Sequence, residues 1–436
     1  MFWRKLYSAL LYLAIPAVLA RLLLRSLRAP SYRRRWAERF ALIPPVPGRP
    51  IWIHAVSVGE TLAAIPLIKR LLEGHPGIPI VITTTTPTGS ERVRALLGKR
   101  VWHCYAPYDL PDVMARFFRR IEPRLIIIME TEIWPNLLAA ARRRGIPVVL
   151  ANARLSARSA ARYRRVACLL RSALRAYHTI AAQSAADARR FRALGAPAER
   201  VQISGNVKFD LEIGAGCIAA GRELRARLGA HRPVWIAAST HQGEESLVLE
   251  AHRGVRARAP QALLILAPRH PERFDAVAAL CRRRGMKTAC RSAGDSVRST
   301  TEVYLADTMG ELPQLYAAAD VAFVGGSLVP VGGHNVLEAA ALGLPVLVGP
   351  HVFNCAEIIA CMETAEGLLR IANTASLARA VADLLVNERH RRALGERAQR
   401  QVIANKGAAQ RLYEIIRALL TEPPARAALS ESRVGC

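Results

Sequence analysis

Residues 320–350 read DVAFVGGSLVPVGGHNVLEAAALGLPVLVGP and contain the pattern that decides the fold. The apolar runs 321–324 and 345–348 predict two strands, with a glycine loop and a helix opening at Asn335 between them. Glycine lets the backbone approach a ligand closely, and the start of a helix offers free N–H groups to an anion. The stretch therefore predicts a phosphate cradle for a nucleotide sugar, as a glycosyltransferase requires.

The rest of the chain after residue 50 alternates short β-rich runs with helical stretches, on both sides of a polar join near 210–232. Such alternation is typical of parallel sheets with helices on both faces. We therefore predict an α/β protein with two Rossmann-like domains, whose ligands bind at the carboxyl ends of the strands in the cleft between domains. Strands are expected at 51–56, 78–84, 101–105, 125–129, 147–151, 179–182, 201–204, 234–238, 262–267, 302–305, 321–324, 345–348 and 368–371.

The charge of the chain is extreme. Its 436 residues include 62 Lys and Arg, of which only six are Lys, against 34 Asp and Glu, so the net charge is +28. Part of an arginine excess can follow from a GC-rich genome, but such a surface still attracts nucleic acid, acidic lipid head groups or phosphorylated substrates. The basic residues are spread over many helices and no motif that reads RNA or DNA appears. No nucleic-acid partner is therefore expected.

The N-terminal segment 6–24 is predominantly apolar. As a helix it would be roughly 28 Å long, close to the hydrocarbon core of roughly 30 Å. Two cations precede residue 6 and seven arginines lie within 21–39, which favours a membrane anchor that keeps the main body on the cytoplasmic side. A helix lying flat in the interface is the alternative. A cleaved signal peptide is disfavoured because no small-x-small cleavage site follows.

Metal-binding and disulfide patterns are missing from the sequence. The eight cysteines form no Cys-x-x-Cys pair, which favours scattered thiols in a reducing compartment. No Asp-x-Asp motif and no His/Asp cluster with metal spacing occurs. We therefore expect neither a metal site nor a cofactor.

Polar clusters follow most of the predicted strands, and several of them carry a family resemblance. These motifs are SVGETLAAIP (57–66), PTGS (87–90), METEIWPN (129–136), ANARLS (151–156), PRHPERF (268–274), DTMGE (307–311) and FVGGSLVPVGGHN (323–335). With them the chain closely resembles the Kdo transferases of Gram-negative lipopolysaccharide assembly, membrane-anchored GT-B glycosyltransferases that move 3-deoxy-D-manno-octulosonic acid (Kdo) from CMP-Kdo to a lipid A precursor. Together the motifs are specific, although the loop 329–332 lacks an expected charged pair and Val336 stands where proline is common.

The resemblance implies an inner-membrane enzyme on the cytoplasmic face. Its partners would be CMP-Kdo, the anionic lipid A precursor (lipid IVA) and inner-membrane lipids. Its parts are expected to be a membrane anchor (1–28), an acceptor-binding domain (29–212), a CMP-Kdo-binding domain (213–425) and a tail (426–436).

Three residues would then act in catalysis. Glu60 corresponds to the family's general base, and a carboxylate within reach of a sugar hydroxyl can take its proton. From the sequence alone an equal alternative is a helix cap, because Ser57 and Glu60 have capping-box spacing. Glu130 and Lys208 correspond to positions that stabilise the transition state, where Lys208 would hold charge on the departing phosphate. Otherwise the two would be a strand-end carboxylate and a solvated lysine.

Three segments would hold the CMP part of the donor. Arg269 suits a phosphate, and Glu338 can accept from both ribose hydroxyls. Asn335 and Glu338 are also spaced as a helix cap and its partner, and His334 is expected either to contact the ligand or to pack the loop. The residues implied are Pro268, Arg269, Met309, Gly310, Glu311, Asn335, Val336, Leu337 and Glu338.

Several questions stay open at this point. A GT-B enzyme of another lipid pathway, using a UDP-sugar, is the nearest alternative. The sequence gives no number of Kdo residues transferred, no acceptor acylation preference and no oligomeric state. It also leaves open whether the anchor spans the membrane.

Overall fold

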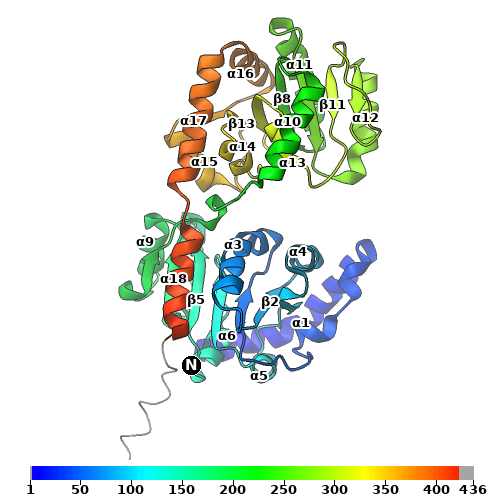
Figure 1. Cartoon of the computed structure of the whole chain (residues 1–436). Coiled ribbons are helices and arrows are strands. Elements are labelled where there is room, and N and C mark those ends of the chain that lie inside the picture. Colours follow the sequence, from blue (N-terminus) through cyan, green and yellow to red (C-terminus); the bar gives the residue numbers. More distant parts are fainter. Residues whose placement is uncertain (1, 422–436) are drawn as a thin grey trace, which may run out of the picture. The chain divides into compact units, whose positions relative to one another are not determined.

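The computed structural model describes residues 2–421 and divides the chain into two compact units (Figure 1). Within these residues, unit 1 comprises 2–210 and 406–421, and unit 2 comprises 211–405. The seven cysteines of this part of the chain are all free thiols, in line with the prediction.

Unit 1 is built on a seven-stranded parallel sheet in the order β3-β2-β1-β4-β5-β6-β7. Its strands are β1 (Ile51–His54), β2 (Ile80–Thr84), β3 (Trp102–Tyr105), β4 (Leu125–Met129), β5 (Val148–Ala153), β6 (Thr179–Ala182) and β7 (Val201–Ile203). Its helices are α1 (Phe2–Arg28), α2 (Trp36–Arg39), α3 (Val58–Gly74), α4 (Pro87–Leu97), α5 (Pro111–Ile121), α6 (Pro135–Arg143), α7 (Ala157–Arg164), α8 (Ala167–Leu174), α9 (Ala185–Ala193) and α18 (Ala408–Thr421).

Unit 2 repeats this plan with the strand order β10-β11-β9-β8-β12-β13-β14, again parallel throughout. Its strands are β8 (Val234–Thr240), β9 (Leu263–Pro268), β10 (Thr288–Cys290), β11 (Val303–Leu305), β12 (Val321–Val324), β13 (Val346–Val348) and β14 (Leu368–Arg370). Its helices are α10 (Ala215–Gly229), α11 (Glu244–Arg258), α12 (Phe274–Arg283), α13 (Leu312–Ala317), α14 (Leu337–Ala341), α15 (Ala356–Thr364), α16 (Thr374–Val386) and α17 (Glu388–Ala404).

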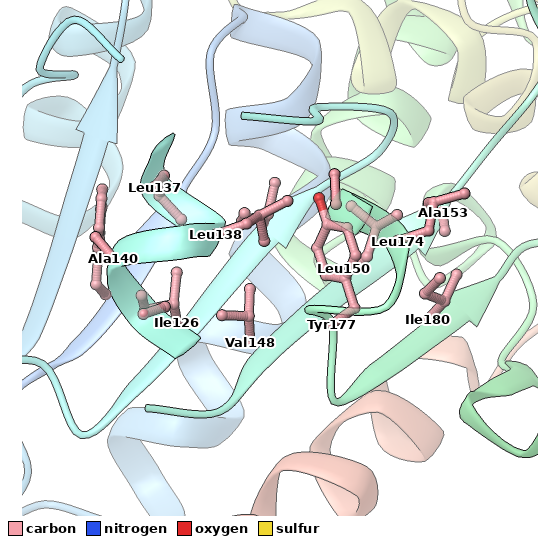
Figure 2. Packing of buried hydrophobic residues seen from close by; sticks show 14 of the residues in the cluster. Ile126, Leu137, Leu138, Ala140, Val148, Leu150, Ala153, Leu174, Tyr177 and Ile180 are labelled. Carbon is pink, nitrogen blue, oxygen red and sulfur yellow. The ribbon is translucent and has the colours of Figure 1, made fainter. Parts of the chain in front are cut away.

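The five central strands of unit 1 are buried on both faces, as a parallel sheet covered by helices requires. Ile126 of β4 and Leu150 of β5 point into one core, where Leu137 and Leu138 of α6 cover them (Figure 2). The neighbouring residues Ile127 and Val149 point into the core on the opposite face. This alternation fixes the register of the sheet, because a shift by one residue would exchange the two faces.

The predicted architecture is confirmed, with three local differences. All thirteen expected strands are present, but β10 was not predicted. The helix expected at Asn335 begins at Leu337 and contains only five residues. The C-terminal boundary predicted at 425 is wrong, because unit 2 ends at Asn405 and α18 packs against α3 of unit 1 (Figure 1). The tail predicted at 426–436 lies outside the described residues.

The predicted apolar N-terminal helix is confirmed as α1. Its stretch Phe2–Leu27 is long and apolar enough to cross a membrane, with a mean hydropathy of 1.8. Leu11 and Ile15 nevertheless pack against the core of unit 1. One side of the helix therefore contacts the protein, while Leu10 and Leu13 on the other side are exposed.

Candidate active site

Glu60 lies in the first turn of α3, directly after β1. Ser57 caps this helix by accepting from the Glu60 N–H (3.2 Å), and the Glu60 carboxylate accepts from the Val56 N–H (2.8 Å) and the Ser57 hydroxyl (2.9 Å). Ser57 therefore caps α3, but the reciprocal bond of a full capping box is not formed, because the Glu60 carboxylate accepts from the Val56 N–H and not from the Ser57 N–H. Each carboxylate oxygen has a second lone pair, so these bonds leave room for a substrate hydroxyl.

The environment of Glu60 favours proton uptake. Its side chain is buried, and this burial raises the pKa of Glu60 to about 8, against the opposing effect of the Val56 N–H. The negative charges of Glu132 and Glu130 add to the increase. A carboxyl group with a pKa near neutrality is a stronger proton acceptor than an ordinary glutamate.

Glu130 and Lys208 come together at the same edge of the sheet. Glu130 follows β4, Lys208 follows β7, and Lys208 Nζ lies 2.9 Å from Glu130 Oε1. Asn152 supports this arrangement by accepting from the Val207 N–H (3.1 Å). Glu130 adopts a φ of 57°, a conformation that a glutamate rarely occupies and that the surrounding contacts must hold.

Glu132 and Trp134 belong to the same constellation, although the sequence assigned them no role. Trp134 donates to Glu132 Oε2 (2.7 Å) and its ring packs edge-on against His54 at 4.4 Å between centroids. Burial raises the pKa of Glu132 and lowers the pKa of His54 to about 3, so His54 is neutral. Both Glu132 and Trp134 lie in the METEIWPN motif. The second glutamate of this motif is the sequence feature that could have indicated their place in the site.

In unit 2, Pro268 ends β9 and Arg269 follows it with an exposed side chain. The Arg269 N–H donates to the Thr240 carbonyl (3.0 Å), which ties the ends of β9 and β8 together. The backbone of Arg269 is thus fixed at the carboxyl edge of the sheet, where a phosphate could accept from its exposed guanidinium group.

The segment 309–311 contains an ion pair that the sequence did not predict. Arg291 donates twice to Glu311, with distances of 2.6 and 2.9 Å. These bonds lower the pKa of Glu311 to about 2, so its carboxylate is ionised and already bound to a cation. Met309 is exposed and Gly310 has a φ of 85°. Contact with a ligand would therefore come from the Met309 side chain and the backbone.

The glycine loop differs from the expected cradle. The N–H groups of Gly332 and Gly333 donate to the Gly326 carbonyl (3.0 and 2.8 Å), so the loop itself uses these two donors. Because α14 has only five residues, its dipole is small as well. A phosphate at this edge would depend on side-chain cations more than on the helix terminus.

The residues after the loop divide into core and polar positions. Val336 and Leu337 are buried, so their side chains serve the core. The Asn335 side chain accepts from the Leu337 N–H and donates to Glu338 Oε1, both at 3.1 Å. Burial raises the pKa of Glu338. The predicted cap at Asn335 is not formed, because Val336 holds the cap position of α14 and makes no side-chain cap bond. Glu338 keeps acceptor capacity for a ribose hydroxyl.

Histidine and glutamate side chains hold the glycine loop at the carboxyl edge of the sheet in unit 2. The rings of His241 and His334 stack at 5.0 Å, with 2.7 Å between their Nε2 atoms, so His334 does pack the loop. Glu244 is fully buried and accepts from the N–H groups of Gly326 (2.7 Å) and Leu328 (2.9 Å), among others. Sequence analysis missed Glu244, because all of its partners except the His241 N–H lie more than 80 residues away.

Within residues 2–421, no group of three or more His, Cys, Asp or Glu side chains is arranged to hold a metal ion.

Comparison with known proteins agrees with the geometry. Residues 34–211 match the family model "3-Deoxy-D-manno-octulosonic-acid transferase (kdotransferase)", and residues 287–401 match "Glycosyl transferases group 1". Among solved structures, Anabaena Alr3699/HepE in complex with UDP is similar, with a TM-score of 0.55 and 15% identity over 86% of this chain and 100% of that chain. The fold and the matched models define a GT-B glycosyltransferase.

Two curated relatives identify the family. The 3-deoxy-D-manno-octulosonic acid transferase of Haemophilus influenzae is 44% identical over 96% of this chain and 99% of that protein. The enzyme of the same name from Bordetella pertussis is 39% identical over 88% of this chain and 90% of that protein. The chain therefore belongs to the Kdo transferases of lipopolysaccharide biosynthesis.

Proposed function

We propose that the protein transfers Kdo from CMP-Kdo to a hydroxyl group of lipid A precursor (lipid IVA), with inversion at the anomeric carbon and Glu60 as general base. Glu60 takes the hydroxyl proton, the oxygen forms a bond to the anomeric carbon, and the bond from that carbon to the CMP phosphate breaks. The observation that carries this proposal is a buried carboxyl group with a pKa near 8 at the carboxyl edge of a parallel sheet.

Lys208 is proposed to stabilise the charge that develops on the phosphate of CMP as it leaves. Its ammonium group is only partly buried, and the 2.9 Å contact with Glu130 holds it in one place. A cation fixed before the reaction stabilises a developing charge without the reorganisation that water would need. Glu130 then acts by orienting Lys208.

The CMP moiety is proposed to bind at the carboxyl edge of unit 2. Arg269 would contact the phosphate, Glu338 the ribose hydroxyls, and the segments 309–311 and 335–338 would surround the nucleoside. Glu311 serves this site through its ion pair with Arg291, which fixes the segment.

A location at a membrane surface would account for the exposed apolar face of α1 and for part of the excess of arginine. We propose that the protein lies on the cytoplasmic face of the inner membrane. There the exposed apolar side chains of α1 contact lipid and the basic residues after it attract anionic head groups.

Replacing Arg269 by Gln is expected to raise the KM for CMP-Kdo about 10- to 100-fold, because a charge-assisted hydrogen bond to phosphate is lost. The matched control is Arg283→Gln, since Arg283 is exposed at the far end of α12, where the chain returns to the start of β10. Steady-state kinetics with varied CMP-Kdo give the result. Equal KM values for both variants would show that Arg269 does not bind the donor.

Chelation is expected to leave turnover unchanged, because Arg269 and Lys208 supply the positive charge that a divalent ion gives other sugar transferases. Activity is measured before and after dialysis against EDTA, with a metal-dependent transferase as a positive control. A loss that added magnesium or manganese restores would contradict metal independence.

The proposed donor is tested by competition. CMP should inhibit the transfer of Kdo to the lipid acceptor, whereas UDP at the same concentration should not. Inhibition by UDP alone would instead favour a UDP-sugar as the donor.

A further inference from the structure

Helix α1 is joined to the active-site side of unit 1 by a buried polar cluster. Tyr7 donates to Asp109 Oδ2 (3.1 Å), and Arg4 donates to Asn136 Oδ1 (3.1 Å). The Ser8 hydroxyl also lies within hydrogen-bond distance of the Asn136 amide group, 3.0 Å from Nδ2 and 3.2 Å from Oδ1. Asp109 and Asn136 are 6% and 2% exposed, so the cluster is shielded from water.

The same cluster fixes the start of α6. Asp109 accepts from the backbone N–H groups of Asn136 (3.0 Å) and Leu137 (2.7 Å), and the Asn136 side chain donates to the Asp109 carbonyl (2.6 Å). Asp109 therefore does the work of an N-terminal cap for α6, because Trp134 at the cap position makes no side-chain cap bond. Tyr7 supplies a further hydrogen bond to this capping carboxylate.

The start of α6 in turn holds the loop 130–134, which ends directly before Pro135, the first residue of the helix. Trp134 is the residue before α6, and it donates to Glu132 while packing against His54. At the other side of the loop, the Thr131 hydroxyl donates to the Arg154 carbonyl (2.5 Å) and the Tyr177 hydroxyl donates to the Glu132 carbonyl (2.7 Å). The loop is thus fixed at both ends, and the α6 end depends on the cluster that contains Tyr7 and Ser8.

We propose that α1 is a positioning element of the active site, whose Tyr7 and Ser8 act through Asp109 and Asn136 to place the loop 130–134 against Glu60. Tyr7, Ser8, Asp109 and Asn136 are positioning residues in this arrangement and do not touch the substrate. The proposal rests on the assignment of Glu60 as the base. It gives the N-terminal helix a second role besides attachment to lipid.

In this arrangement the contacts of α1 influence the electrostatic environment of Glu60, and therefore its pKa. The charged groups that act on Glu60 among the described residues are Glu132 and Glu130, and Glu130 is paired with Lys208. Burial and the charge of Glu132 both raise the pKa of Glu60. If the loop loosens, Glu132 moves away and water enters, so the pKa of Glu60 falls toward its ordinary value.

The test compares Tyr7→Phe with Tyr12→Phe in the full-length protein. Both changes remove one hydroxyl from α1, but the Tyr12 hydroxyl bonds to the exposed Asp112 of α5, which is not part of the cluster that caps α6. Tyr7→Phe is expected to lower kcat about two- to thirtyfold, the range seen for residues coupled to a site at a distance. It should also shift the acidic limb of the kcat–pH profile to lower pH and leave the KM for CMP-Kdo unchanged. Tyr12→Phe should match the wild type in all three.

A wild-type kcat and acidic limb in folded Tyr7→Phe would overturn the proposal. If Tyr7→Phe does not fold, Ser8→Ala decides in its place, because it removes only one hydroxyl from the same cluster, and the same two readouts apply. The outcome is separable from that of the proposed function. Normal turnover of Glu60→Gln would refute the base, whereas normal turnover of Tyr7→Phe beside an inactive Glu60→Gln would refute only the role of α1.

Discussion

The variant Glu60→Gln is expected to lose about 10²- to 10⁴-fold in kcat, which is the usual contribution of a general base. Glutamine is nearly the same size and its carbonyl can still accept from the Val56 N–H, so the capping role survives and the melting temperature should stay close to that of the wild type. If Glu60 were only a helix cap, both turnover and fold would be retained. The two interpretations of this residue therefore predict different kinetics.

Glu73→Gln is the matched control, because Glu73 is an exposed glutamate on the same helix. It should behave as the wild type. Turnover of Glu60→Gln within a few-fold of the wild type would show that another group takes the proton.

The pH dependence follows from the same residue. Only the ionised carboxylate can accept a proton, and burial raises the pKa of Glu60 to about 8. Activity should therefore fall as the pH decreases below about 8, by tenfold for each further unit. In Glu60→Gln this acidic limb should disappear from the residual activity, which a kcat–pH profile will show. A wild-type limb near pH 4.5 would mean that bound substrate or solvent removes the effect of burial.

The second large effect is expected for Lys208→Met, which removes the proposed cation from the departing phosphate. Loss of one preorganised electrostatic contact to a transition state typically costs about 10²- to 10³-fold in kcat. Methionine keeps much of the volume of the lysine side chain, so a change in packing contributes little. Lys208→Met removes the cation and also leaves the Glu130 carboxylate without its partner. Glu130→Gln keeps the cation and loses only the group that orients it, so we expect it to be less impaired than Lys208→Met.

Lys69→Met serves as the control, because Lys69 is an exposed lysine on α3. Single-turnover kinetics at saturating CMP-Kdo separate the chemical step from donor binding. A variant Lys208→Met that retains the wild-type single-turnover rate but binds CMP-Kdo weakly would assign Lys208 to donor binding instead.

The sequence predicted the architecture well because strands buried on both faces appear as continuous apolar runs between turn residues. Strand β10 was missed because its three residues, Thr288 to Cys290, contain no such run. The position of α18 could not be predicted, since an amphipathic helix carries no information on which domain covers its apolar face. The helix at Leu337 was predicted two residues early, because Asn335 lies outside the helix and its side chain accepts from the Leu337 N–H.

The candidate site was predictable where motif and strand end coincide, as for Glu60, Glu130 and Lys208. The structure brings Glu130 and Lys208 together although 78 residues separate them, and it adds Glu132 beside them. The structure also shows ion pairs and hydrogen bonds that no local sequence pattern predicts. Arg291 binds Glu311 across 20 residues, and Glu244 gathers backbone N–H groups from a loop more than 80 residues away. Such contacts depend on the packing of distant segments, which only the folded chain shows.

The central claim is that the protein moves Kdo from CMP-Kdo to a lipid A precursor with the help of Glu60. Mass spectrometry of the lipid after incubation with CMP-Kdo and purified protein tests it most directly. The account predicts that the wild type adds one or more Kdo residues with release of an equal amount of CMP, and that Glu60→Gln adds almost none. A lipid that gains no Kdo with the wild-type protein, or gains it equally well with Glu60→Gln, would contradict the account.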